Sequence, residues 1–351
     1  MEIFAYLLVL SGICSGLGFA HISRHSSHLY ATPLFRPLIC EIRHSPKEGP
    51  APLREDPTPR ESISQQNPTS WEVRPSPGKG FGVFATRLIE LGERIMVEEP
   101  LFTIQPPEFI PGKGYELSAM VSSLDSAVAS LSPDRRAEFH SCHAHHLPGE
   151  ENSNMVIFRS NAYTLTDGTI AMFPKIARIN HSCRPNAANV WSQASGVRVI
   201  WAAKDILPGE EVTVTYAPLL KTSEERQSRL SQYGFRCNCE ACSDHYHTDS
   251  RRVRMGRLLT ELEERLGRST SDVANRRLLP KGRELSQMLE DEHLADYLAN
   301  AYHLTAELYL RSKNISAAAE WSRKALQLNE NADRESHASF REREFLDNIL
   351  S

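Results

Sequence analysis

The sequence lacks a strong excess of charge of either sign. Its 351 residues include 40 lysines and arginines against 44 aspartates and glutamates, which gives a formal net charge of −4 at pH 7. Domains that bind nucleic acid through a broad surface carry a marked positive excess. We therefore expect no direct nucleic-acid site. The length and the hydrophobic content of 40% are typical of globular proteins and predict two folded units with tails.

Long apolar runs are lacking as well, except at the start of the chain. Beyond residue 20 no run reaches the length that crosses a lipid bilayer, so we expect no membrane span there. Residues 1–20 are mostly apolar and contain Gly18 and Ala20, small residues that suit a signal-peptidase site. They resemble a secretory signal peptide, although the only charge among them is that of Glu2. A short anchor and an incorrectly assigned first exon are the alternatives.

Large apolar side chains are scarce in residues 21–68. Ten of the 21 prolines lie between Pro33 and Pro77, among serine, arginine, glutamate and glutamine. A segment of this composition cannot bury enough surface to offset the entropy lost on ordering. Residues 21–68 are therefore predicted to be a disordered linker or pro-segment.

Cysteines are few, but three of the seven lie within six residues. Cys237, Cys239 and Cys242 have the spacing C-x-C-x2-C, and thiols this close cannot form a strain-free set of disulfides among themselves. The spacing is typical of a zinc site, which needs a fourth ligand. Cys183 is the first candidate for that ligand. His245 is an alternative, as is His247.

Two other interpretations of the cysteines remain. One is a secreted domain held together by disulfides, for which Cys40 is a poor partner because it lies in the predicted linker. The other is a metal site in the run Cys142–His146, which has no C-x2-C pair nearby. We expect no metal at Cys142–His146.

The densest polar chemistry lies in the stretch Arg178–Asn186. Asn180, His181, Ser182 and Cys183 are consecutive, and apolar residues flank them on both sides. A buried polar cluster is costly unless each group finds a partner. The stretch therefore indicates a bound ligand, a metal or a neighbouring strand. A loop whose side chains cap their own backbone is the alternative.

Short strands are predicted on both sides of this stretch, and helices at two places. Gly80 and Gly82 would let a ligand approach the backbone closely. Apolar residues at helical spacing predict a partly helical insert over about residues 105–155 and helices throughout residues 248–351. The expected strands are Trp71–Arg74, Phe81–Ala85, Arg94–Glu99, Phe158–Leu165, Gly168–Phe173, Val197–Ala203 and Val212–Tyr216.

The C-terminal pattern has two notable parts. Leu258, Leu259, Leu262 and Leu266 form one apolar helix face. Residues 317–326 resemble half of a tetratricopeptide-type helix pair, and one or two such units cannot build a long solenoid. We expect a small helical domain there.

Four stretches together resemble a SET-domain protein-lysine methyltransferase. They are Lys79–Gly82, Asn180–Cys183, Gly209–Tyr216 and the cysteines of residues 237–242, in the family's order over roughly residues 69–245. The chain is similar to the SET/MYND group and to fungal SET proteins without the MYND finger, whose cysteine/histidine array is not visible here.

The resemblance implies a fold and a set of domains. It implies a mainly β SET domain of small curved sheets with a pseudoknot over residues 69–217. A zinc-binding post-SET segment would follow over residues 218–247. The helical pattern of the sequence itself predicts an α-helical, TPR-like domain over residues 248–351. That last domain would pack beside the post-SET segment and shape the substrate groove.

The resemblance also implies S-adenosylmethionine as the methyl donor and a structural zinc ion. Cys183, Cys237, Cys239 and Cys242 would bind the zinc, and four thiolates leave no open position for catalysis. At the cofactor, the resemblance implies that Lys79 meets the methionine carboxylate, that the Gly80 backbone lies against the cofactor and that Phe235 packs on the adenine. Asn180 and His181 would donate or accept hydrogen bonds to the cofactor, and Asn161 would face its side of the site. Phe81 would lie there too, with no polar contact assigned to it.

Three tyrosines are the implied catalytic residues. Tyr216 would hold the line of attack, while Tyr163 and Tyr233 would form the walls of an apolar channel. Methyl transfer to an amine needs alignment and a neutral lysine, and desolvation beside a sulfonium lowers the lysine pKa. The alternative for each tyrosine is that it is an ordinary aromatic residue of the core or of a strand edge. This alternative is stronger for Tyr163 than for Tyr216.

The predicted function is therefore S-adenosylmethionine-dependent methylation of a lysine presented by a protein substrate, a histone tail or another protein. A catalytically silent SET-fold scaffold is the second hypothesis, and a secreted cysteine-rich domain is the third. Zinc thiolates and the methyl donor suit the nucleus or cytoplasm. Asn180–Ser182 is also a glycosylation sequon, so secretion would put a glycan at the implied cofactor site. The signal-like residues 1–20 conflict with this location.

Overall fold

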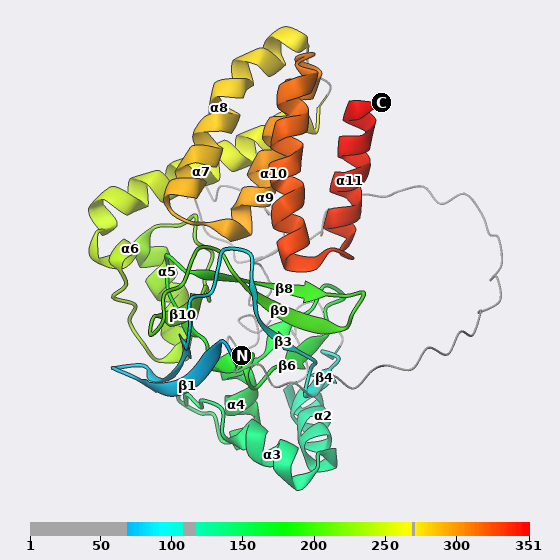
Figure 1. Cartoon of the computed structure of the whole chain (residues 1–351). Helices are drawn as coiled ribbons and strands as arrows, with labels where there is room; N and C mark the ends of the chain where they lie inside the picture. Colours follow the sequence, from blue (N-terminus) through cyan, green and yellow to red (C-terminus); the bar gives the residue numbers. More distant parts are fainter. Residues whose placement is uncertain (1–68, 108–116, 269–270) are drawn as a thin grey trace, which may run out of the picture. The chain divides into compact units, whose positions relative to one another are not determined.

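The computed structural model describes residues 69–107, 117–268 and 271–351 (Figure 1). The predictions made for residues 1–20 and 21–68 lie outside the described residues. Within the described ranges, all strands lie before residue 215, with helices between some of them, and only helices follow. The expected arrangement of small sheets followed by a helical C-terminal region is confirmed.

The first sheet has the strand order β1-β2-β10-β7. β1 and β2 form an antiparallel hairpin in which Ser76 is opposite Gly80. β10 pairs with β2 in antiparallel fashion and with β7 in parallel, with Thr213 opposite Asn180. The polar stretch thus becomes an edge strand beside the Gly80 hairpin. The strands are β1 (Trp71–Ser76), β2 (Gly80–Ala85), β7 (Asn180–His181) and β10 (Glu211–Val214).

Two further sheets of three strands complete the β region. Their orders are β3-β9-β8 and β4-β6-β5. β-branched and aliphatic side chains from the sheets fill a common core, in which Val83, Ile200 and Val212 are fully buried. The strands are β3 (Arg94–Glu98), β4 (Phe102–Ile104), β5 (Tyr163–Thr164), β6 (Ile170–Met172), β8 (Ala187–Ser192) and β9 (Val197–Ala202).

The strand predicted over Phe158–Leu165 is wrong. Helix α4 (Ser153–Asn161) occupies its first half, and only β5 remains as strand. The Asn152 side chain accepts a hydrogen bond from Met155 N and fixes the helix start. Residues 155–161 are all buried, and a run buried on every face shows no period that separates helix from strand.

The insert contains two further helices, α2 (Leu117–Ser130) and α3 (Pro133–His140). α2 packs against α4 and β4. Because α4 ends at Asn161, the helical insert extends beyond its predicted end at about residue 155.

Helices fill the chain after β10. The face predicted from Leu258, Leu259, Leu262 and Leu266 is buried, as expected. α7 begins at His245, just before the predicted boundary at residue 248. The helices are α5 (Ser223–Leu230), η2 (Ser231–Tyr233), α6 (Glu240–Ser243), α7 (His245–Leu266), α8 (Asp272–Asp291), α9 (Ala295–Arg311), α10 (Ile315–Asp333) and α11 (His337–Leu350).

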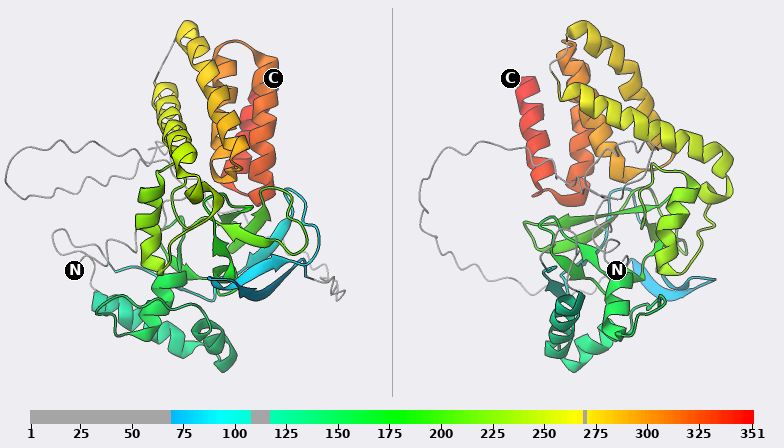
Figure 2. Two further views of the ribbon diagram at one scale, coloured as in Figure 1. Left: turned by 90° about the vertical axis from the view of Figure 1, so that its left-hand side faces the viewer. Right: turned by 180° about the vertical axis from the view of Figure 1, so that it is seen from behind.

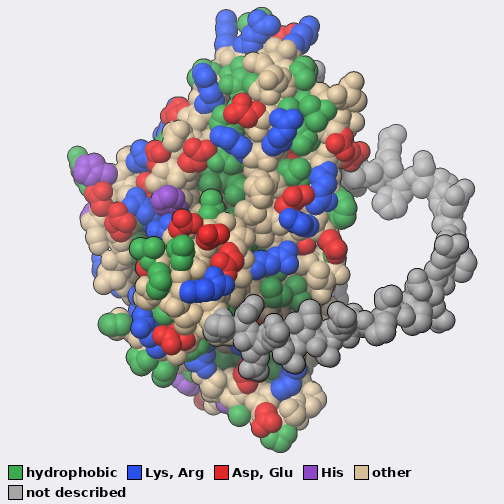
Figure 3. All heavy atoms as spheres, in the orientation of Figure 1, with side chains coloured by type: hydrophobic (Ala, Val, Ile, Leu, Met, Phe, Trp, Pro, Cys, Tyr) green, Lys and Arg blue, Asp and Glu red, His purple; other side chains and the backbone are tan. Residues whose placement is uncertain are grey.

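The C-terminal helices contact the β region directly. α9 packs against β8, and α10 packs against both β8 and β9. Figure 2 shows these helices and the insert helices α2–α4 at opposite ends of the sheets. On the face drawn in Figure 3, acidic and basic side chains are interspersed over the helices and sheets. None of the described helices is both long and apolar enough to cross a membrane.

Candidate active site

Four rings from three separate segments meet beside the first sheet. The Tyr216 ring, just after β10, lies 5.1 Å from Tyr233 and 5.4 Å from His181 between ring centroids. Phe235 lies edge-on to Tyr216 at 6.4 Å and tilted toward His181 at 6.1 Å. The structure therefore brings together Tyr216, Tyr233, His181 and Phe235, which are referred to below as the ring cluster.

Tyr216 is held from both ends. Its hydroxyl donates a hydrogen bond to Ile179 O at 2.5 Å, and its backbone N–H donates to His181 Nδ1 at 2.9 Å. Burial, with smaller contributions from Tyr163 and Tyr233, raises the pKa of Tyr216 well above its usual value. The phenol is thus neutral at physiological pH and can act as a hydrogen-bonding group, not as a base.

Tyr163 borders the same site from β5. Burial raises the pKa values of Tyr163 and Tyr233, and the three phenols lie close enough to influence one another. The Arg198 guanidinium stacks over the Tyr163 ring at 4.2 Å from its centroid. Phe173 packs edge-on against Tyr163, with ring centroids 5.9 Å apart. The three tyrosines named from the sequence thus lie around one site.

His181 uses both ring nitrogens within the chain. Nδ1 accepts from Tyr216 N, which assigns the proton to Nε2, 3.2 Å from Cys183 Sγ. Burial lowers the pKa of His181 to about 3. The imidazole is therefore neutral and links the ring cluster to the first of the four cysteines.

Asn180 and Lys79 meet at a residue that was not singled out from the sequence. Glu211 accepts from Lys79 Nζ at 2.8 Å and from Asn180 Nδ2 at 2.7 Å, and Asn180 Nδ2 is also 3.0 Å from Phe81 O. Burial alone would raise the pKa of Glu211, but the bonds from Lys79 and Asn180 hold it below its usual value. Glu211 lies inside the stretch Gly209–Tyr216, and this position in a family motif is the sequence feature that could have identified it.

Gly82 permits this arrangement. A Cβ at position 82 would lie 2.4 Å from Glu211 Oε1 and 2.9 Å from Asn180 Nδ2, so a larger residue would displace both side chains. Gly80 serves differently: its φ of +76° suits the turn, and a Cβ there would meet no atom within 4 Å. The Gly80 backbone is accordingly open to a ligand.

Two buried side chains fix the polar stretch against the sheets. The Glu98 carboxylate accepts from Lys175 N and Ile176 N at 3.0 and 2.8 Å, where the short helix η1 (Ile176–Arg178) begins. Asn186 donates to Glu211 O and accepts from Thr213 N, at 2.9 and 2.8 Å. Both ends of the stretch are thereby tied to neighbouring strands.

The other two predicted cofactor residues lie differently. The Asn161 amide, at the end of α4, donates to His143 O and Ile157 O at 2.6 and 2.7 Å. The Phe81 side chain is 56% exposed on β2, although its carbonyl binds Asn180. The roles of Asn161 and Phe81 toward a cofactor remain predictions.

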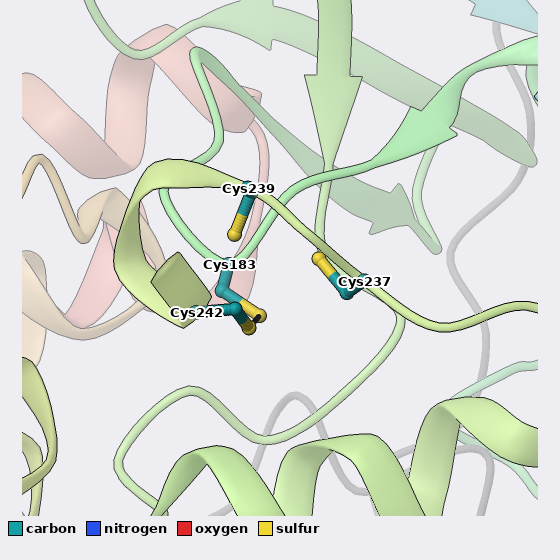
Figure 4. A group of neighbouring side chains, drawn as sticks. All are labelled: Cys183, Cys237, Cys239 and Cys242. Carbon is teal, nitrogen blue, oxygen red and sulfur yellow. Dashed lines mark hydrogen bonds between the residues drawn. The ribbon is translucent and has the colours of Figure 1, made fainter. Parts of the chain in front are cut away.

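The four cysteines named from the sequence converge (Figure 4). Their Sγ atoms all lie within 4.8 Å of one another, and those of Cys183 and Cys242 are 3.6 Å apart. Zinc–sulfur bonds of about 2.3 Å in a tetrahedron place sulfurs about 3.8 Å apart. All four thiols are free of disulfides. The donor set and its spacing thus fit zinc.

The alternative ligands do not join this group. His247 Nδ1 lies 2.7 Å from Asp244 Oδ1 and is exposed, and neither it nor His245 belongs to the set of converging ligand atoms. Among the described residues, the four cysteines are the one such set, so the run Cys142–His146 is not one. Burial raises the pKa of the Cys142 thiol to about 11.

Comparison with known proteins agrees with this geometry. The SET domain model matches residues 80–217. Over 219 residues the chain is 28% identical to histone-lysine N-methyltransferase set5 of Schizosaccharomyces pombe. This alignment covers 62% of this chain and 59% of that protein. The chain is also 28% identical over 165 residues to N-lysine methyltransferase SMYD2 of Homo sapiens. That alignment covers 44% of this chain and 38% of SMYD2. The Gallus gallus SMYD2 is 30% identical over 138 residues, covering 36% and 31%.

The chain spans less than two thirds of the length of these curated relatives. The matched segment nevertheless contains β2, the polar stretch, β10 and Tyr216. Residues 80–217 are a SET domain, the segment of the chain that the family model matches.

Proposed function

We propose that the protein transfers a methyl group from S-adenosylmethionine to the side chain of a lysine in another protein. The ring cluster, with the Tyr216 hydroxyl fixed on Ile179, is the observation that carries the proposal. The names of set5 and SMYD2, both N-lysine methyltransferases, support it. A histone tail and a non-histone protein are both compatible substrates.

Tyr216 can direct the reaction without exchanging a proton. Its hydroxyl hydrogen is directed at Ile179 O, so the oxygen lone pairs remain available to accept from polarised groups. The methyl donor supplies a sulfonium, and alignment of donor and amine accounts for much of the rate in such a displacement. The fixed phenol oxygen supplies a preorganised partial negative charge.

The attacking lysine must lose its proton before it reacts. Tyr163, Tyr216 and Tyr233 line the site with half-buried aromatic rings, and burial disfavours the charged form of an amine. All three phenols have raised pKa values and His181 is neutral with both nitrogens engaged. We therefore propose that desolvation, not a general base from the ring cluster, yields the neutral lysine.

Lys79, Asn180 and the Gly80 backbone are the proposed cofactor contacts on the first sheet. Glu211 positions two of them, because it holds both the Lys79 ammonium and the Asn180 amide. Lys79 remains partly exposed and can meet a carboxylate. Phe235 presents an aromatic face beside His181, which suits stacking on a base.

Zinc is proposed as a structural ion held by Cys183, Cys237, Cys239 and Cys242. Cys183 follows β7, whereas Cys237 and Cys239 precede α6 and Cys242 lies within it. A metal held by all four would clamp the segment that contains Tyr233 and Phe235 onto the polar stretch. Four thiolates saturate a tetrahedral ion, so it would act on the fold and not on the substrate.

The test is methyl transfer by the purified full chain. Tritiated S-adenosylmethionine is incubated with core histones and with an array of lysine-containing peptides. We expect label in a protein or peptide, released on hydrolysis as methyl-lysine. Cofactor binding without transfer to any member of a broad array would favour the scaffold hypothesis.

We also propose that the protein works in a reducing compartment, the nucleus or the cytoplasm. Cysteines 142, 183, 237, 239 and 242 are all free, and the sequon residue Asn180 has its amide engaged by Phe81 O and Glu211. Fluorescence of a C-terminal fusion, with a glycosidase shift on gels, would test it. Nuclear or cytoplasmic signal without a shift supports the proposal, and a glycosylated secreted product contradicts it.

A further inference from the structure

Beside the four thiols lies a guanidinium that is cut off from solvent. Arg226 of α5 has an exposed fraction of 0%. Its Nε donates to Cys183 Sγ at 3.3 Å, and its Nη2 approaches Cys242 Sγ at 3.8 Å. The remaining N–H groups face the carbonyls of Lys221 and Ala241. One planar fork thus contacts two of the four candidate zinc ligands.

A buried guanidinium is costly unless a negative charge compensates it. In the described part of the chain, the one carboxylate paired with Arg226 is Asp249, at 3.5 Å. Asp249 already accepts shorter bonds from Ser223 N and Ser223 Oγ, at 2.7 and 2.8 Å. Asp249 is therefore a weak partner for so deeply buried a charge.

A second buried arginine shows the contrast. Arg252 of α7 is also 0% exposed, but it donates to the buried Glu292 Oε2 at 2.9 Å, a carboxylate that also accepts from Arg184 and Arg251. It also donates to Cys183 O at 2.9 Å, which fixes the backbone of that ligand. Arg252 thus holds the peptide of Cys183, whereas Arg226 faces its sulfur.

The charge of Arg226 needs a negative partner, and thiolates bound to a metal ion provide one. Neutral thiols offer little compensation to a cation. Four thiolates around a divalent ion leave two net negative charges, located mainly on sulfur. Arg226 is placed to offset one of them through N–H···S bonds, which lower the electron density that sulfur gives to a metal.

We propose that Arg226 is a positioning residue of the four-cysteine metal site: it binds the sulfurs of Cys183 and Cys242, offsets the cluster's charge and strengthens zinc binding. The proposal rests on the zinc site proposed above. It also explains why α5, which contributes no ligand, packs against the metal-binding segment.

Zinc affinity of the full chain at one fixed pH tests the proposal, by competition with a chelator. Arg226→Met keeps bulk and removes the charge, and loss of such a supporting contact weakens metal binding by about 10- to 100-fold. The matched control is Arg159→Met. Arg159 is 4% exposed and ion-paired with Glu150 at 2.7 Å, so the control removes a buried charge whose hydrogen bonds go to Glu150, Gln232 O and His145 O and to no thiol. We expect its zinc affinity to match that of the wild type.

Cobalt substitution provides a readout that loss of stability would not move. Removing N–H···S bonds raises the energy of the sulfur lone pairs, so the sulfur-to-cobalt charge-transfer band should shift to longer wavelength in Arg226→Met. Arg226→Lys, which retains charge but not the fork, should show the same direction of shift and intermediate zinc affinity. It serves as the test if the methionine variant does not fold.

The outcomes separate the two proposals. Wild-type zinc affinity together with an unshifted cobalt band in the Arg226 variants would overturn the role of Arg226 and leave the metal site intact. A wild-type protein that binds neither zinc nor cobalt would overturn the metal site and the role of Arg226 with it. A shift and weakening in the Arg226 variants, absent from Arg159→Met, would establish the role.

Discussion

The Tyr216 hydroxyl donates its hydrogen to the Ile179 carbonyl oxygen across 2.5 Å. Ile179 directly precedes β7, and Tyr216 lies two residues after the end of β10, the strand that pairs with β7. One hydrogen bond therefore ties the proposed catalytic phenol to the segment that contains the proposed cofactor residues. The position of the phenol oxygen is thus set by the backbone and not by a flexible side chain.

Tyr216→Phe should fold, with a measurable loss of stability. It leaves the Ile179 carbonyl without its donor, which costs about 1–3 kcal/mol for a buried group. Urea unfolding measures this loss. Because the ring remains, the ring cluster should persist, and the near-ultraviolet circular dichroism of the folded state should retain its shape. Collapse of that spectrum would show that the hydroxyl is needed for the fold itself.

Glu211→Gln should weaken cofactor binding and alter the acid stability. The folded pKa of Glu211 is lowered, so its stabilising contribution is present above the unfolded pKa of about 4.3 and is lost as pH falls through the folded value. The variant should be less stable at neutral pH and should lose less stability between neutral and acid pH. Chemical unfolding at several pH values tests this. Parallel profiles for both proteins would contradict it.

Gly234→Ala should be destabilised more than another glycine of similar conformation. Gly234 has φ +79°, and a Cβ there would lie 2.2 Å from His145 Nδ1. Gly168 has φ +86° with no atom within 4 Å of its Cβ position, so Gly168→Ala is the matched control.

The left-handed conformation alone costs alanine about 1–2 kcal/mol, and overpacking adds about 1–3 kcal/mol in Gly234→Ala. The extra cost should appear in urea unfolding. Since Gly234 adjoins Tyr233, methyl transfer should fall too. Equal losses in both variants would show that His145 moves aside freely.

Glu292→Gln should be strongly destabilising. The Glu292 carboxylate is 3% exposed and accepts from Arg184 and Arg252, so its loss leaves buried guanidinium charge uncompensated. Breaking such a pair costs about 3–5 kcal/mol.

The neighbouring residue provides the control. Asp291 pairs with Arg251 at the surface with its side chain 47% exposed, and Asp291→Asn should cost about 0–1 kcal/mol. Thermal unfolding distinguishes the two variants. Similar unfolding midpoints would mean that the arginines around Glu292 move or gain water when the carboxylate is removed, and this would contradict the expected cost.

Removal of one cysteine should release the metal and loosen the ring cluster. Cys239→Ser takes away one of four ligands, so we expect the loss of one zinc per chain and a lower unfolding temperature. Cys142→Ala is the control, because Cys142 is buried and free but lies outside the four-cysteine set. It should keep its zinc. Loss of zinc from the control, or its retention in Cys239→Ser, would contradict the ligand assignment.

The sequence allowed much of the site to be located because its key residues are consecutive. Asn180–Cys183 and Cys237–Cys242 are local patterns, and each can be read without knowing the fold. The strand assigned over Phe158–Leu165 failed because burial on all sides removes the period that distinguishes helix from strand.

Residues that act through distant partners could not be predicted. Glu211 meets Lys79 across 132 positions, and Arg226 meets Cys183 across 43. Glutamate and arginine side chains are usually exposed to solvent, and the neighbouring sequence does not show that Glu211 is half-buried and Arg226 fully buried. Their roles follow from pairing in space, which depends on the strand order β1-β2-β10-β7 and on the packing of α5.

The most direct test of the proposed activity compares wild type and Tyr216→Phe for two properties in parallel. Calorimetric titration measures S-adenosylmethionine binding, and single-turnover transfer of labelled methyl to an identified lysine peptide measures the chemical step. We expect Tyr216→Phe to retain cofactor affinity and to transfer about 100- to 1,000-fold more slowly, as when a preorganised polar group is removed. An unchanged transfer rate in Tyr216→Phe would contradict the assignment of this phenol as the catalytic group. Absence of cofactor binding in zinc-loaded, folded wild type would contradict the proposed activity itself.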